Sequence, residues 1–191
     1  MYRFIFASRI ALLALAFGTI GLHANSKSAK PGQTYSNREK GFGITMPGGW
    51  EMKRDVMGAV VVAISPLKGP KDVFRENVNV VVEDLNGPMT SKEYYTNSMK
   101  VLKQLFKDFK LEKQGVVKID KHDFHFSVFS HRLGETRAKV LQYMAVNGKR
   151  AYVVTCSATP DAYKNYQARF EDTVKSFKFE DGKGLASSKE K

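Results

Sequence analysis

The hydrophobic pattern is clearest between residues 76 and 85. Val78, Val80 and Val82 recur there at every second position, and β-branched residues with this period are typical of a β-strand. Val81 interrupts the polar series between them, which indicates that both faces of the strand contact protein. We therefore expect this segment to lie inside a sheet.

Other segments show the same strand signals. Residues 59–64 are apolar at every position, as in a strand covered on both faces. Asn147-Gly148 is the strongest two-residue hairpin signal, and tight turns join the strands from residue 111 onward, so these strands are antiparallel neighbours. Trp50, the single tryptophan, is expected to pack against the core. The remaining predicted strands are residues 42–46, 111–119, 124–132, 136–146 and 150–157.

Two segments have the period of an amphipathic helix. The first begins with a capping box formed by Thr90 and Glu93 and is expected to run to Phe109. The second begins at Thr159-Pro160, a hydroxyl cap followed by proline at the first helical position. Their apolar faces are Tyr95, Met99, Leu102, Phe106 and Phe109, and Tyr163, Tyr166, Phe170, Val174 and Phe177.

Strands outnumber helices, and both amphipathic helices must bury their apolar faces on the sheet. The pattern predicts an α+β fold, a mostly antiparallel β-sheet sandwiched with two main amphipathic helices.

The N-terminus has the pattern of an export signal. Arg3 and Arg9 precede an apolar run at residues 10–20, and Ala24 is a small residue suited to cleavage. The alternative is an uncleaved anchor, although the run is short for a membrane span. No cysteine stands directly after the apolar run, so lipidation of the new N-terminus is not expected. We expect a periplasmic or secreted protein without a transmembrane span after cleavage.

These signals divide the chain into four parts. We expect a signal peptide at residues 1–24, a flexible linker at 25–34, a folded domain at 35–179 and a disordered tail at 180–191.

Composition indicates which class of partner the protein binds, but it does not indicate an activity. The formal net charge is +12 and favours anionic partners, such as lipid head groups, cell-wall polymers or an acidic protein. Nucleic acid is not expected, because the helix aromatics are needed for the core and an exported protein seldom meets it. Cys156 is the single cysteine, so no internal disulfide forms.

The order of several motifs resembles the PsbP-like and DcrB-like domains. Residues 42–47, Phe-Gly-Ile-Thr-Met-Pro, followed by Trp50, resemble the Phe-x-Ile-x-x-Pro…Trp opening of these domains. Residues 74–80, Phe-Arg-Glu-Asn-Val-Asn-Val, resemble their Asn-Val-x-Val strand. The capped helix and the closing aromatic helix follow in the same order, so the likeness covers residues 35–179.

The resemblance implies a PsbP-like α/β/α sandwich and a non-enzymatic role. Plant PsbP is an extrinsic subunit of the photosystem II oxygen-evolving complex, and bacterial relatives are exported envelope proteins or chaperones for secreted effectors. The plain export signal of this chain differs from a thylakoid transit peptide and from a cytoplasmic chaperone. No segment matches the metal-retaining part of the photosystem subunit. We therefore assign no metal ligand, cofactor or catalytic residue.

One basic series is the candidate binding site. Lys100, Lys103, Lys107 and Lys110 would share one stripe beside the apolar face of a helix. Such a stripe is commonly a solvated helix face. The alternative is a docking stripe for an anionic surface, either cell wall or lipid head groups.

Other polar residues have ordinary interpretations. His122, His125 and His131 are expected to be strand and turn residues, because the last two are about 20 Å apart on one strand. We expect Asn77 and Asn79 to bond backbone groups of neighbouring loops, the alternative being amides presented to a ligand.

The sequence thus predicts an exported, non-enzymatic accessory protein that binds an envelope protein or an anionic surface. The alternative is a carrier of a small ligand or polyanion, and an enzyme is third. An exposed apolar patch beside lysines favours docking, a deep apolar pocket favours the carrier, and a cleft with converging titratable groups favours the enzyme.

Overall fold

The computed structural model describes residues 31–70, 72 and 74–180. Its elements in chain order are β1 (Gln33–Asn37), β2 (Phe42–Met46), β3 (Glu51–Val56), β4 (Ala59–Ile64), β5 (Asn77–Asp84), α2 (Ser91–Leu105), β6 (Lys107–Ile119), β7 (His122–Leu133), β8 (Thr136–Asn147), β9 (Arg150–Ala158), α3 (Pro160–Lys175) and β10 (Lys178–Phe179). No helix in this part of the chain is long and apolar enough to cross a membrane.

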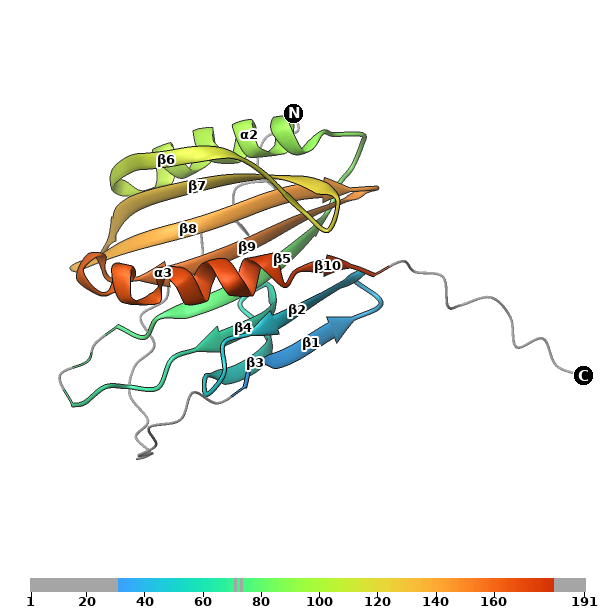
Figure 1. The fold of residues 1–191 in the computed structure, drawn as a ribbon. Coiled ribbons are helices and arrows are strands. Elements are labelled where there is room, and N and C mark those ends of the chain that lie inside the picture. The colour runs from blue at the N-terminus through green and yellow to red at the C-terminus, as the bar shows by residue number, and fades with distance from the viewer. Residues whose placement is uncertain (1–30, 71, 73, 181–191) are drawn as a thin grey trace, which may run out of the picture.

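Seven strands form one antiparallel sheet in the order β3-β4-β5-β9-β8-β7-β6 (Figure 1). The valine-rich strand β5 lies between β4 and β9, so the prediction that it is internal is confirmed. The strands β1, β2 and β10 form a small second sheet. The predicted α+β class is confirmed.

One face of the large sheet is covered by α3 and the small sheet. Figure 1 shows α3 crossing in front of β9, with β10 and β2 beyond its end. Aromatic rings fill this layer: Phe42 stacks on Phe177 with centroids 5.6 Å apart, and Trp50 meets Phe170 at 6.3 Å. Trp50 is only 4% exposed, as predicted.

The other face carries α2, which packs over β8, β7 and β6. Tyr94, Met99 and Leu102 are its large buried side chains. The capping box is present, since the Thr90 hydroxyl accepts from the Glu93 amide at 3.2 Å and the Glu93 carboxylate accepts from the Thr90 amide at 2.8 Å. Thr159 caps α3 as predicted.

The end of α2 differs from the prediction. The helix stops at Leu105, because Phe106 takes an extended conformation and its ring stacks on His131 at 3.8 Å. β6 then begins at Lys107, and Phe109 packs on Phe129 from this strand. Two aromatic residues at helical spacing thus lie outside the helix, Phe106 at its C-cap and Phe109 in β6, and both pack on side chains of β7.

The limits of the folded part also differ slightly. Gln33 and Thr34 belong to β1 rather than to a linker. Glu180 is bound to the fold, because its amide donates to the Gly41 carbonyl at 3.0 Å and its carboxylate accepts from Ser36 at 2.9 Å. The predicted signal peptide, residues 25–30 of the predicted linker and residues 181–191 of the tail lie outside the described residues.

Candidate binding surface at the α2–β6 border

The structure does not place the four candidate lysines on one helix. Lys100 and Lys103 lie on α2, whereas Lys107 and Lys110 lie on β6, because the chain leaves the helix at Phe106. The predicted helical stripe is therefore wrong. However, α2 packs beside β6 (Figure 1), so all four lysines occupy the surface formed by these two elements, here called the α2–β6 border.

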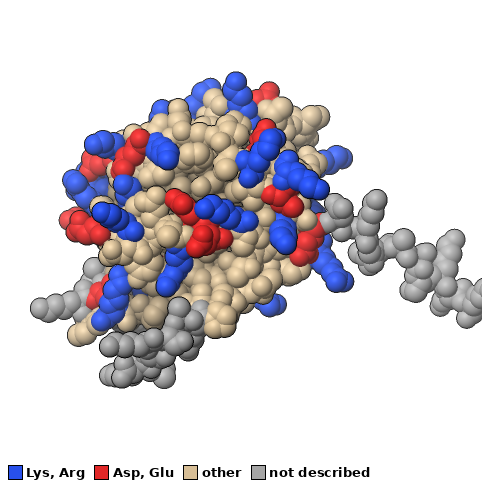
Figure 2. Space-filling view, viewed as in Figure 1, with Lys and Arg blue, Asp and Glu red and all other residues tan. Residues whose placement is uncertain are grey.

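The lysines of this border are not neutralised within the described part of the chain. All four are exposed, and none of them has an ion pair there. The nearby acids are already paired with other cations: Asp108 lies 3.1 Å from Arg132 Nε, and Glu112 lies 2.6 Å from Lys139 Nζ. In Figure 2, Lys and Arg reach the upper rim, where α2 and β6 lie.

Exposed apolar side chains lie on the same border. Leu105 at the end of α2 is 51% exposed, and Val116 and Val117 on β6 are 54% and 38% exposed. β6 is an edge strand, so these valines have no strand beyond them among the described elements. The border thus combines apolar side chains with unpaired cations, as docking surfaces commonly do.

The histidines lie apart from one another. His125 stacks on Tyr95 with centroids 5.4 Å apart, and His131 stacks on Phe106, so both lie on the α2 face. His122 packs on Phe179 at the opposite end of β7. Within the described residues, no three His, Cys, Asp or Glu side chains converge as a metal ion would require.

Cys156 is buried in the α3 face of the sheet. Burial raises the pKa of its thiol, so the sulfur is protonated at neutral pH. A protonated, buried thiol has the properties of a small apolar side chain rather than of a nucleophile.

A row of buried polar side chains crosses the α2 face of the sheet. Asn79, Thr155, Gln142 and Ser127 are successive cross-strand neighbours on β5, β9, β8 and β7. Only one bond joins them, from Gln142 Nε2 to the Thr155 hydroxyl at 2.9 Å. Sequence reasoning missed this row, because its members come from four separate segments.

Most polar atoms of this row lack a hydrogen-bond partner. Both amide atoms of Asn79, Oε1 of Gln142 and Oγ of Ser127 have none among the residues that the structure describes. The expected backbone bonds are found only for Asn77, whose Nδ2 donates to the Arg75 carbonyl at 3.2 Å. A buried polar group without a partner costs about 1–3 kcal/mol, so the row lowers the stability of the fold.

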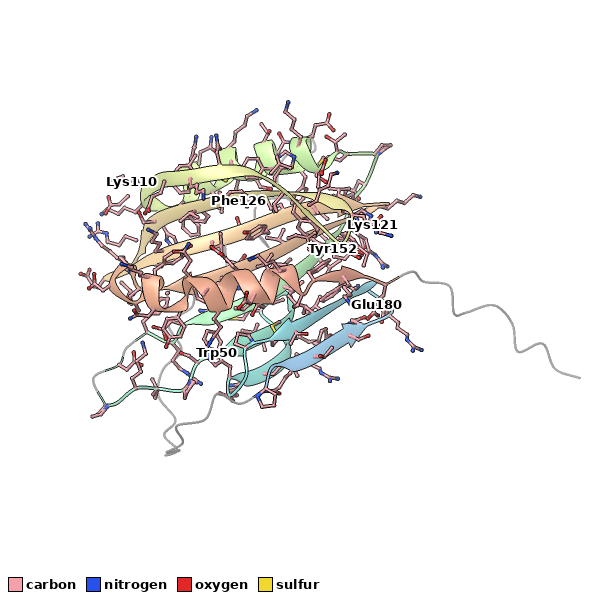
Figure 3. All side chains as sticks on the ribbon, viewed as in Figure 1. Trp50, Lys110, Lys121, Phe126, Tyr152 and Glu180 are labelled. Carbon is pink, nitrogen blue, oxygen red and sulfur yellow. The ribbon has the colours of Figure 1, made fainter. Side chains whose placement is uncertain are left out.

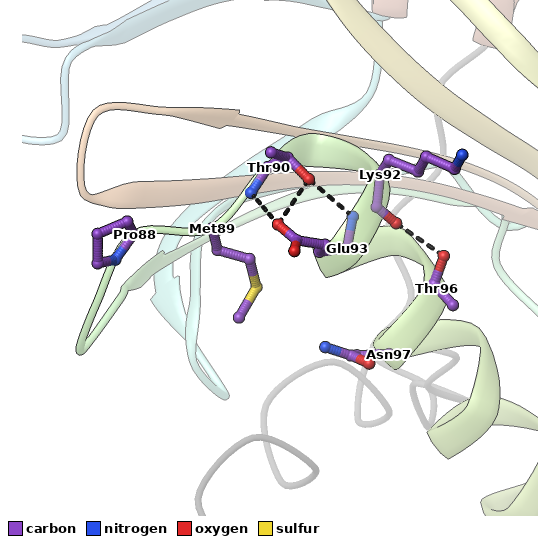
Figure 4. A pocket seen from close by; sticks show the side chains of 7 residues that line it. All are labelled: Pro88, Met89, Thr90, Lys92, Glu93, Thr96 and Asn97. Atoms are coloured by element: carbon purple, nitrogen blue, oxygen red, sulfur yellow. Dashed lines mark hydrogen bonds between the residues drawn. The ribbon is translucent and has the colours of Figure 1, made fainter.

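Open hollows lie on the described surface. One of them, of about 620 Å³, lies at the start of α2 (Figure 4). Its polar groups are already engaged, because Thr90 and Glu93 form the capping box and Thr96 donates to the Lys92 carbonyl at 2.8 Å. A smaller hollow of about 310 Å³ lies near the start of β6 and includes Lys110 and His131.

Comparisons with known proteins agree with this architecture. Cyanobacterial PsbP from Synechocystis sp. PCC 6803 has a similar structure, with a TM-score of 0.59 and 16% identity over 85% of this chain and 99% of that one. LpqN of Mycobacterium tuberculosis, described as involved in cell envelope biogenesis, gives 0.59 and 10% identity over 79% of this chain and 86% of that one. Protein PA94 of Pseudomonas aeruginosa gives 0.56 and 13% identity over 76% and 95%.

These structural likenesses show the fold alone. The comparison with curated proteins found no match. The family model described as PsbP matches residues 32–179, which is most of the chain and includes all of the large sheet and both described helices. The chain therefore belongs to the PsbP family.

Proposed function

We propose that this protein is an exported, non-catalytic member of the PsbP family that docks on an anionic partner at the cell envelope. The apolar N-terminal segment supports export. A structural neighbour, LpqN, is described as involved in envelope biogenesis. Docking would use the α2–β6 border.

The observation that carries this proposal is the combination of charge and apolar exposure on that border. Four exposed lysines without ion pairs in the described residues share α2 and β6 with exposed Leu105, Val116 and Val117. Positive charge attracts an anionic surface over long range, and the attraction is screened by salt. The apolar side chains would add contact area once the surfaces meet.

The test is retention of the exported protein on vesicles that contain phosphatidylglycerol. The double variant K103E/K107E places negative charge on both elements of the border and should abolish retention at low salt. K164E, which reverses an exposed lysine on α3, is the matched control for net charge. Equal retention of the wild type and K103E/K107E would refute docking through this border on a lipid surface.

A protein partner is tested separately by cross-linking in the native envelope. One stoichiometric partner that is lost with K103E/K107E but kept with K164E would identify the anionic partner as a protein. Recovery of that partner with all three proteins would place its binding site elsewhere.

A second candidate function is a carrier of a small polar ligand. It is favoured by polar atoms of Asn79, Gln142 and Ser127, which are neutral donors and acceptors on one sheet face and have no hydrogen-bond partner in the described part of the chain. Mass spectrometry of the protein purified from its host tests this candidate. A small molecule that accompanies the wild type but not N79V would support the carrier, and its absence from both would count against it.

A further inference from the structure

The outer edge of β6 is regular over its second half. Among the described strands β6 pairs only with β7, so its other side is a free edge of the large sheet. Both register shifts of this pairing lie between Lys107 and Lys113, whereas each residue from 113 to 119 has one partner on β7. Bulges keep many edge strands from pairing with another chain. Residues 113–119, here called the β6 edge, lack this protection.

Backbone groups of the β6 edge point away from the sheet. The turn at Asp120 and Lys121 has φ values of 46° and 68°, as in two-residue hairpins whose flanking pair is hydrogen-bonded. Hydrogen-bonded and non-hydrogen-bonded pairs alternate along an antiparallel ladder. Counted back from the turn, Lys118, Val116 and Gln114 stand in non-hydrogen-bonded pairs. Their N–H and C=O groups therefore face away from β7, where an added strand would bond them.

Side chains on both faces of the β6 edge are exposed. Val116 lies opposite His125 on the α2 face and is 54% exposed. Val117 lies opposite Phe124 on the α3 face and is 38% exposed. A strand added to this edge would thus gain cross-strand apolar contacts on both faces.

Gly115 extends the apolar part of the edge. A Cβ at this position would lie 2.8 Å from Cε1 of Phe126, so the ring of Phe126 (Figure 3) lies directly over the glycine. The ring belongs to β7 and reaches across β6 toward the edge. Positions 115–117 therefore form a continuous apolar stretch.

Lysines flank this stretch. Lys113 is exposed and has no ion pair in the described part of the chain. Lys118 lies 2.9 Å from Asp123, but both side chains are largely exposed, so water weakens this pair. Lys110 and Lys121, labelled in Figure 3, extend the positive charge beyond both ends of the edge. Such an edge repels a second copy of itself and attracts an acidic segment.

We propose that the β6 edge binds an acidic segment of a partner protein by addition of a β-strand. The segment would carry an acidic residue near each end, facing Lys113 and Lys118, and three β-branched residues between them, covering positions 115–117. Main-chain hydrogen bonds give such a complex its affinity, and the side chains give its specificity. This inference rests on the docking function proposed above and specifies the anionic partner as an extended protein segment.

The first experiment is a titration of the exported protein with the fluorescent peptide Glu-Val-Val-Val-Thr-Glu, blocked at both termini and followed by fluorescence polarisation. Saturable binding that weakens with added salt is expected. The peptide Lys-Val-Val-Val-Thr-Lys is the matched control and should not bind, because its charge has the wrong sign. Absence of saturable binding by the acidic peptide would overturn the proposal.

Amide hydrogen exchange followed by NMR separates strand addition from charge attraction alone. With the peptide at ten times its Kd, the amides of Gln114, Val116 and Lys118 should exchange about tenfold more slowly, because each would donate to the peptide. The amides of Gly115 and Val117 face β7 and should change little. Binding without slower exchange at Val116 would refute an added strand.

Two variants of one position test the same bonds. V116P removes an outward N–H, and an edge strand tolerates proline there, since Gly115 before it accepts an extended conformation. V116P should weaken peptide binding by about tenfold or more. V116T keeps the amide and the β-branched shape and should bind as the wild type does. Equal affinity of V116P and V116T would place the contact elsewhere and overturn the proposal.

Peptides methylated on nitrogen make the test independent of the folding of V116P. One alternate set of peptide amides would face β6 and the other would face solvent. Methylation of the first set should abolish binding, and methylation of the second should preserve it. Equal binding of the two methylated peptides would refute an added strand.

Vesicles distinguish failure of this inference from failure of the proposed docking. V116P should keep its retention on phosphatidylglycerol vesicles, and K103E/K107E should lose retention and still bind the acidic peptide. Vesicle retention without peptide binding would refute this inference and leave docking on lipid standing. A wild-type dimer in light scattering that dissociates in V116P would assign the edge to a second copy and overturn the acidic partner.

Discussion

The two faces of the large sheet are built differently. The α3 face is apolar and aromatic, with Phe42, Phe177 and Tyr152 in mutual ring contact under the helix and the small sheet. The α2 face has a smaller apolar cluster and carries polar side-chain atoms without a hydrogen bond in the described residues, among them those of Asn79 and of the His131 ring. We infer that the α3 face supplies most of the stability, while the α2 face keeps polar groups that lower the stability of the fold.

The largest expected effect concerns the α3 face. F170A removes a fully buried ring that packs on Trp50 and Tyr163, and it should lower the free energy of unfolding by about 3–5 kcal/mol. Urea unfolding followed by Trp50 fluorescence measures this change. A loss below about 1 kcal/mol would mean that the aromatic layer is not the main source of stability.

A smaller effect of opposite sign is expected on the α2 face. N79V replaces an unpartnered buried amide with an apolar side chain of similar size and should raise the free energy of unfolding by about 1 kcal/mol. V80N, the neighbouring position on the opposite face, is the control and should destabilise, because it buries an amide among apolar side chains. Destabilisation by N79V would show that the amide has a partner, and the contrast between the faces would fail.

The smallest effect is a pH dependence of stability. Burial lowers the pKa values of His131 and His125, so the unfolded chain binds protons more readily than the native protein. The free energy of unfolding should be highest above pH 6.5 and should decrease as the pH falls below this value. H131Q should show a shallower decrease than the wild type, with a residual slope from His125.

Chemical denaturation at several pH values, at constant ionic strength and without sulfate or phosphate, measures this slope. Identical slopes in the two proteins without sulfate would exclude His131 as the responsible group.

Local pattern predicted much of the fold. The alternation of Val78, Val80 and Val82 placed β5 inside the sheet, and Thr90 and Thr159 marked the starts of both helices correctly. These signals are local, since a strand alternates and a helix start needs a cap whatever the rest of the chain does. The end of α2 was missed because Phe106 and Phe109 fit a helical face and a strand face equally well.

The candidate site depended on the same ambiguity. The spacing of Lys107 and Lys110 assigned both lysines to the helix. In the structure both lie on the edge strand β6, because Phe106 and Phe109 contact β7. No sequence pattern places Lys110 and Arg137 around one hollow, because that relation arises only when β6, β7 and β8 pair and β6 forms a bulge opposite His131.

The sequence by itself determined which segments form strands and helices, the family to which they belong and the excess of positive charge. Those properties follow from residue type and spacing, and they survive any small error in element limits. Only the tertiary structure decided which cations remain unpaired, which polar groups are buried without partners and which apolar side chains stay exposed. The physical reason is that ion pairing, burial and exposure are properties of neighbours in space, and strand register sets those neighbours.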